Sequence, residues 1–239
     1  MIRQVVEGHG LKWKGLQMKL IAFRKYIQEK TLPGDIVMMM DANDVLFVGE
    51  PQHILDAYQD LAAPIVASAE RGCAPQGSGL EEDLLCADDG NDLLYPMPPK
   101  IPIFDNPEFD LSFRYLNSGT YMGDRDALLH LLDFYANTWQ FECFNALGQA
   151  YSATRDQRCL TSFYIHCHAE GDIMLDHQQR IVSTMAAVPL SSYGVDEKGR
   201  LVNLASGHVT AMLHGNGWQA HLTKNEFFSK YEVVPGMEQ

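Results

Sequence analysis

Two aspartates, Asp41 and Asp44, stand three residues apart in the stretch "DIVMMMDANDVLF" at 35–47. The five apolar residues at 36–40 predict a strand buried on both faces, so both carboxylates fall where that strand turns into a loop. Hard oxygen ligands suit Mg²⁺, Mn²⁺ or Ca²⁺. Because open α/β sheets bind ligands at the carboxyl ends of parallel strands, the pair predicts a divalent-metal site. An ordinary solvated turn would use the same residue types.

A histidine, His214, opens the segment "HGNGW" and follows the apolar run "VTAML". At a strand end it offers an imidazole ligand. The Gly-Asn-Gly that follows gives a tight backbone that can approach an anion. The alternative is a glycine turn with an incidental histidine.

Polar side chains at three further element ends could bind a sugar or a phosphate. The segment "LNSG" at 116–119 suits recognition of hydroxyl groups, although it is equally a turn signal. The segment "RDQR" at 155–158 puts an acid and an amide where a helix begins, and an acid there also interacts favourably with the helix dipole. Lys19 lies on the first predicted helix, where it is either solvated or available to neutralise a metal-bound diphosphate.

The elements that must position these residues follow an α/β order. Helix, strand, helix and strand succeed one another over 15–70, which implies parallel pairing. No periodicity extends over 71–110, so we expect a long loop there. The remaining expectations are strands at 115–123, 171–175 and 208–213, a hairpin around Lys198-Gly199, and helices at 124–139, 155–166 and 223–231.

The composition is that of an ordinary globular protein, and residues 1–239 are expected to form a single domain. The net charge of −13 argues against nonspecific binding to nucleic acid, which relies on Lys and Arg. No apolar stretch approaches the roughly 18 residues of a membrane helix, and residues 1–15 lack the apolar core of a signal peptide. Five cysteines leave at least one unpaired within a monomer.

An ordered set of seven segments resembles the glycosyltransferase domain of the procollagen lysyl hydroxylases and the related collagen galactosyl- and glucosyltransferases. The resemblance runs from about Gly15 to the C-terminus. The segments are "KG…MK", "DIVMMMDANDVLF", "VASAERGCAP", "YLNSGTYMG", "DQRCLTSFYI", "MLDHQQRIV" and "HGNG".

This resemblance implies a nucleotide-sugar transferase fold of the A type, a Rossmann-like mixed sheet flanked by helices. Residues 1–14 contain no full strand–helix unit like the one that opens such a sheet, so we expect the N-terminal strand to be missing. The family binds Mn²⁺ and a UDP-sugar and transfers glucose or galactose to hydroxylysine or its galactosylated form. The resemblance thus implies a hexosyltransferase with Mn²⁺ or Mg²⁺, acting on a protein or glycan hydroxyl in the endoplasmic reticulum lumen.

The resemblance also assigns roles to single residues. Asp41, Asp44 and His214 match the metal ligands. Asp156 and Gln157 match an acidic run beside the sugar and the acceptor, and Glu70 matches an acid on the acceptor side. Asp156 and Glu70 are therefore the candidate catalytic residues. The residues that match the binding site of the donor are Lys19, Asn117, Ser118, Gly119, Asn216 and Gly217.

Three other functions stay open from the sequence. The chain could be a noncatalytic or weakly active relative that binds metal and nucleotide diphosphate. It could be a metal phosphohydrolase, for which water replaces the acceptor. It could also be a structural partner that associates with a complete transferase or with a second copy, because an unpaired sheet edge favours association.

Overall fold

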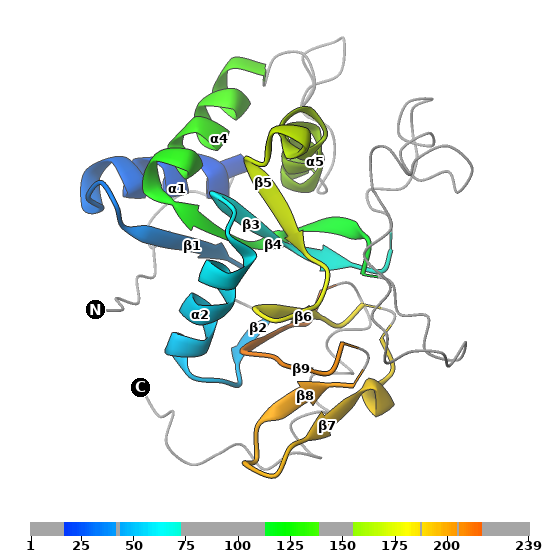
Figure 1. Ribbon diagram of the computed structural model, residues 1–239. Helices are drawn as coiled ribbons and strands as arrows, with labels where there is room; N and C mark the ends of the chain where they lie inside the picture. The colour runs from blue at the N-terminus through cyan, green and yellow to red at the C-terminus, as the bar shows by residue number, and fades with distance from the viewer. Residues whose placement is uncertain are drawn as a thin grey trace.

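The computed structural model describes residues 17–41, 44–72, 113–138, 155–186, 188–204 and 206–216 (Figure 1). Residues 1–14, where the N-terminal strand is expected to be missing, lie outside these ranges. So do most of the expected loop at 71–110, the expected last helix at 223–231, and Gly217. The described part is mixed α/β.

The largest sheet has four strands in the order β1-β4-β3-β5, namely Ile36–Met40, Tyr115–Asp124, Ile65–Glu70 and Ile173–Asp176. β4 runs antiparallel to both of its neighbours, whereas β3 and β5 are parallel. The expected parallel pairing of β1 with β3 is therefore wrong: the two strands point the same way, but β4 separates them. Every residue of β4 except the first and last is buried, as its central place in the sheet requires.

Three helices cover one face of this sheet: α1 (Gln17–Lys30), α4 (Arg125–Thr138) and α5 (Arg155–Cys167) (Figure 1). The sequence predicts an apolar stripe of Leu16, Leu20, Phe23 and Ile27 on the first helix. Leu16 lies outside the described residues, and the other three are buried in the core, which confirms their part of the stripe.

The other face of the sheet packs against α2 (Pro51–Leu61) and a second sheet. That second sheet has the order β2-β10-β6, namely Val45–Phe47, Met212–His214 and Val182–Thr184. Pro51 begins α2, as expected of a proline at the first helical position. The four-stranded sheet is thus a central layer between α1, α4 and α5 on one side and α2 with the second sheet on the other.

A third sheet is the antiparallel meander β7-β8-β9, with strands Tyr193–Val195, Leu201–Asn203 and His208–Val209. The hairpin expected around Lys198-Gly199 joins β7 to β8, and Gly199 has the positive φ of 76° that such a turn favours. The single strand expected at 208–213 is two strands, β9 and β10. Two short 3₁₀ helices, His168–Glu170 and Leu190–Ser192, complete the described elements.

Burial along β1 differs from the expectation. Val37 and Met39 are buried against the helices, and Met38 and Met40 pack only partly against the second core. Ile36 is 41% exposed. β1 lies at the edge of the sheet within the described residues, so an apolar run that suggests burial on both faces is fully buried on one.

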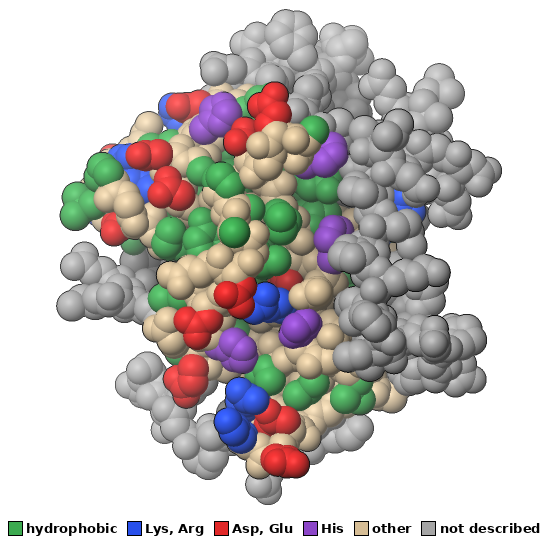
Figure 2. Space-filling view, in the orientation of Figure 1, with side chains coloured by type: hydrophobic (Ala, Val, Ile, Leu, Met, Phe, Trp, Pro, Cys, Tyr) green, Lys and Arg blue, Asp and Glu red, His purple; other side chains and the backbone are tan. Residues whose placement is uncertain are grey.

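Charged side chains of both signs lie together on the face shown in Figure 2. Arg180 pairs with Asp60 at 2.5 Å, and Arg200 pairs with Asp196 at 2.6 Å. Among the described helices, none has the length and apolar character needed to cross a membrane.

Candidate metal centre

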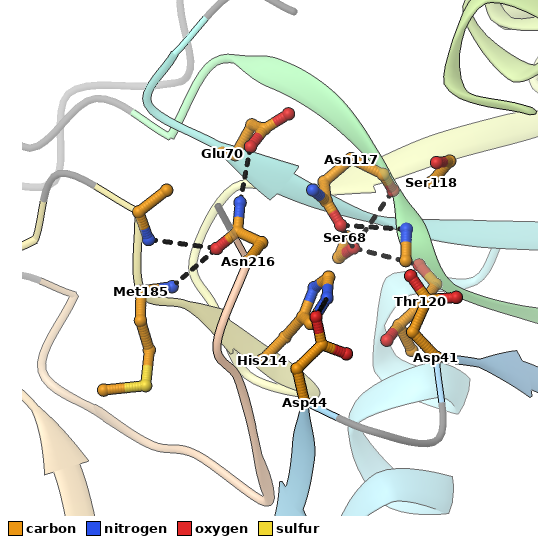
Figure 3. A network of polar contacts seen from close by, with 12 residues as sticks. Asp41, Asp44, Ser68, Glu70, Asn117, Ser118, Thr120, Met185, His214 and Asn216 are labelled. Carbon is orange, nitrogen blue, oxygen red and sulfur yellow. Dashed lines mark hydrogen bonds and ion pairs between the residues drawn. The ribbon is translucent and has the colours of Figure 1, made fainter. Parts of the chain in front are cut away.

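Asp41, Asp44 and His214 converge where the central sheet meets the second sheet (Figure 3). Asp41 follows the last residue of β1, Asp44 precedes β2, and His214 ends β10. The pairing of β10 with β2 sets His214 opposite Val45, beside Asp44. One ligand atom from each of the three side chains lies within 4.8 Å of the others. Metal bonds of about 2.0–2.6 Å put ligands on opposite sides of one cation about 4–5 Å apart, so this spacing fits a single ion.

The imidazole of His214 is buried and suited to bind a metal ion. It is 2% exposed, and its Nδ1 atom is buried without a hydrogen-bond partner among the described residues. Its Nε2 atom lies 3.6 Å from Oδ2 of Asp44, beyond hydrogen-bond distance. A buried imidazole is ordinarily hydrogen-bonded. An imidazole with two carboxylates is a donor set that divalent cations accept, so these residues fit a metal ion.

The lack of a side chain at Gly119 leaves the space that the imidazole of His214 occupies. A Cβ atom at position 119 would lie 2.0 Å from Cε1 and 2.6 Å from Nε2 of His214. The backbone of Gly119 also accepts a hydrogen bond of 2.8 Å from the N–H of Asp41. One residue of β4 therefore positions two of the three candidate ligands.

Lys19 connects the metal triad, which we define as Asp41, Asp44 and His214, to a third acid. Its ammonium lies 2.7 Å from Oδ1 of Asp41 and 2.5 Å from Oδ2 of Asp156. Burial alone would lower the pKa of Lys19, but the charges of Asp156 and Asp41 outweigh it, so that the pKa is raised. Lys19 is therefore an ion-paired residue on α1 rather than a solvated one.

Asp156 and Gln157 begin α5 and reach toward the "LNSG" segment of β4. Asp156 is 5% exposed and accepts a hydrogen bond of 3.2 Å from the hydroxyl of Ser118. Oε1 of Gln157 accepts one of 3.3 Å from the N–H of Ser118. Nε2 of Gln157 donates to the carbonyl of Leu116 at 3.0 Å. The start of α5 thus holds the strand that carries Gly119.

Glu70, the last residue of β3, is 5% exposed and accepts hydrogen bonds on both carboxylate oxygens. Nε2 of Gln157 donates to Oε1 at 2.6 Å, and Nδ2 of Asn216 donates to Oε2 at 2.6 Å. Burial raises the pKa of Glu70 above its usual value, against the opposing effects of its amide donors and of His214.

Asn216 ties the segment after β10 to two other parts of the chain (Figure 3). Its Oδ1 accepts hydrogen bonds from the N–H groups of Met185 at 3.0 Å and Ala186 at 2.9 Å. Its Nδ2 donates to Glu70. These contacts use both acceptor positions of Oδ1 and one N–H of Nδ2, which is the pattern of a residue that holds a loop in place.

Two residues beside the site, Ser68 and Tyr121, are not among the candidates predicted from the sequence. The hydroxyl of Ser68 lies 3.1 Å from the carbonyl of Asn117 and 3.0 Å from that of Thr120. Tyr121 is buried, and the charges of Asp156 and Asp41 add to the effect of burial in raising its pKa. Ser68 could have been noticed as the polar residue within the apolar run at 65–69. An aromatic residue such as Tyr121 is ordinary in a buried strand, so the sequence does not single it out.

The structure thus brings the named site residues into one connected group, apart from Gly217, which lies outside the described ranges. The members of that group are Lys19, Asp41, Asp44, Glu70, Asn117, Ser118, Gly119, Asp156, Gln157, His214 and Asn216. Neither the models of known protein families nor the sequences of curated proteins give a match to this chain.

Proposed function

We propose that this protein is a metal-dependent glycosyltransferase that moves a hexose, glucose or galactose, from a UDP-sugar to a hydroxyl acceptor. The observation that carries the proposal is the convergence of the metal triad with Lys19 and Asp156 at the end of a mixed sheet. We further propose that this sheet belongs to the A-type nucleotide-sugar transferase fold, which its covering helices and the placement of Asp41 after β1 support.

The cation proposed for the triad is Mn²⁺ or Mg²⁺, held by Asp41, Asp44 and His214. Two carboxylates favour hard cations, and the imidazole favours Mn²⁺ over Mg²⁺. When bound, such a cation supplies positive charge that stabilises the diphosphate leaving group of a nucleotide sugar. Lys19, 2.7 Å from a triad carboxylate, would add a second positive charge to that leaving group.

Asp156 is the proposed catalytic residue. It is buried, it is fixed by Lys19 and Ser118, and it lies one ion pair away from the triad. In that place its carboxylate would orient a sugar hydroxyl or accept the proton of the incoming acceptor hydroxyl.

Glu70 suits a positioning role better than a catalytic one. Both of its oxygens already accept hydrogen bonds from amide groups, one on α5 and one after β10. We propose that Glu70 holds these two segments at the correct distance around the site.

A donor screen tests the function. Purified protein is incubated with UDP-sugars, Mn²⁺ and a hydroxylysine-containing collagen peptide, and the transferred hexose is measured by mass spectrometry. We expect transfer that EDTA abolishes. Asp41→Ala should lose it, whereas Glu197→Gln, at an exposed carboxylate of the β7–β8 turn, should keep it.

The same assay separates the alternatives. Metal-dependent UDP binding without transfer would identify a noncatalytic relative, and release of free sugar without acceptor would identify a hydrolase. Equal UDP binding by the wild type, Asp41→Ala and His214→Ala with Mn²⁺ would contradict the metal assignment.

A further inference from the structure

Lys19 shares a carboxylate with the metal triad. Its ammonium is 2.7 Å from Oδ1 of Asp41, one of the three candidate ligands, and 2.5 Å from Asp156, which is not. The side chains of Lys19 and Asp156 are 17% and 6% exposed, so solvent screens this pair poorly. A protein cation therefore already occupies one side of the site that a metal ion would enter.

The charge around the site explains what this cation does. Without a metal, the ammonium of Lys19 pairs with the carboxylates of Asp41 and Asp156, and the carboxylate of Asp44 lies beside Asp41 in the triad. A divalent ion bound to Asp41 would stand within a few ångströms of that ammonium. Like charges at such distances in a partly buried site repel strongly.

The position of Asp41 does not depend on Lys19. The N–H of Asp41 donates to the carbonyl of Gly119 at 2.8 Å, and β1 pairs with β4 up to the residue before it. Removing the ammonium would therefore leave the carboxylate near its place while removing the repulsion. A role of Lys19 in merely holding Asp41 predicts the opposite change in metal affinity.

We propose that Lys19 is an internal competitor of the divalent cation, which weakens metal binding by sharing Asp41 and by repelling the ion. This inference rests on the metal site of the proposed function. Its consequence is that the cation binds weakly by itself, and that an anionic ligand able to pair with Lys19 strengthens its binding.

Direct titration with Mn²⁺ alone, followed by the electron paramagnetic resonance signal of free Mn²⁺, tests the proposal without any substrate. We expect Lys19→Gln to bind Mn²⁺ about tenfold more tightly than the wild type. The matched control is Lys25→Gln, an exposed lysine on the same helix that removes the same charge and should bind as the wild type does.

If circular dichroism shows that Lys19→Gln does not fold, Lys19→Met, which keeps the aliphatic stem, takes its place. We expect it to show the same increase in Mn²⁺ affinity. Equal or weaker Mn²⁺ binding by the folded Lys19 variant would overturn the competition while leaving the metal site intact. Tightening by Lys25→Gln of the same size would overturn it as well, since the effect would then be one of net charge. Absence of Mn²⁺ binding in the wild type and the Lys19 variants alike would overturn both this inference and the proposed function.

Discussion

At the scale of single residues, Gly119 has no space for a side chain, because the imidazole of His214 lies against it. Gly119→Ala would place a methyl group 2.0 Å from the imidazole of His214, so the ring or the strand has to move. We expect a loss of about 1–3 kcal/mol in the free energy of unfolding. We also expect at least about a tenfold loss in Mn²⁺ affinity, because an ångström-scale displacement breaks a metal bond of about 2 Å.

Gly123→Ala is the control for Gly119→Ala. A Cβ at position 123, in the same strand, would lie 2.6 Å from the carbonyl oxygen of Pro64, away from the metal triad. We expect it to destabilise the protein similarly and to leave Mn²⁺ affinity unchanged. A comparable loss of affinity in both variants would mean that general loosening of β4, and not the imidazole contact, governs binding.

Replacing the carboxylate of Glu70 with an amide should destabilise the protein. Gln157 turns its Nε2 toward Glu70 because its Oε1 accepts from Ser118, and Asn216 turns its Nδ2 there because its Oδ1 accepts from two N–H groups. Glu70→Gln therefore sets one NH₂ group against another. We expect the free energy of unfolding to fall by about 1–3 kcal/mol at pH 7, measured by urea denaturation.

The same variant has a pH signature. The pKa of Glu70 is raised in the folded protein above its ordinary 4.5. At pH values between 4.5 and the folded pKa, the folded state therefore holds a proton that the unfolded state has released. Stability from this group is therefore present below pH 4.5 and is lost as the pH rises through the folded pKa. Glu70→Gln lacks this dependence, so the advantage of the wild type should be larger at pH 5 than at pH 8. An advantage that shrinks toward pH 5 would contradict the raised pKa.

At the scale of elements, a bulge in β4 shapes the site. Opposite β3, the register changes between Ala67, which faces Tyr121, and Ser68, which faces Asn117. Residues 118–120 are therefore extra in β4, and the bulge carries Gly119 toward His214. Bulges of this kind re-aim side chains near functional sites.

Ser68 stabilises that bulge, because its buried hydroxyl is within hydrogen-bond distance of the carbonyls of Asn117 and Thr120. Ser68→Ala removes this donor, so we expect a loss of about 1–2 kcal/mol in stability and a weaker Mn²⁺ affinity. Ser206→Ala, at a buried serine of the β8–β9 turn, is the control and should affect stability alone. Unchanged Mn²⁺ affinity in Ser68→Ala would show that the bulge keeps its shape without the hydroxyl.

Local elements could be predicted from the sequence because their signals are local. The apolar stripe of Leu16, Leu20, Phe23 and Ile27 indicated α1, and Pro51 indicated the start of α2. Strands of three residues such as β2 and β6 are too short for a periodic pattern. The strand order could not be predicted either, because β4 pairs with β1 across some eighty residues of chain and no local sequence pattern indicates that pairing.

At the scale of the whole molecule, the metal triad joins two sheets. Asp41 follows β1 of the four-stranded sheet, whereas Asp44 precedes β2 and His214 ends β10 of the second sheet. The residue types indicated the candidates in the sequence, but their convergence within 4.8 Å depends on how the sheets pack. The same packing explains why Ser68 and Tyr121 escaped notice, since each acts through neighbours distant in sequence.

Because a cation in the triad would hold the two sheets together, Mn²⁺ should stabilise the folded chain as a unit. A ligand that binds only the folded state at 100 times its dissociation constant adds about 2.7 kcal/mol, which for a chain of this size raises the Tm on the order of 5–10 °C. We expect such a rise by differential scanning calorimetry and its reversal by EDTA. Asp41→Asn should lose the rise because it removes the only ligand on the four-stranded sheet within the described triad, whereas Glu197→Gln should retain it. If Mn²⁺ raised the Tm of Asp41→Asn by the same amount, the stabilising ion would bind elsewhere on this acidic chain. The triad would then not be the metal site.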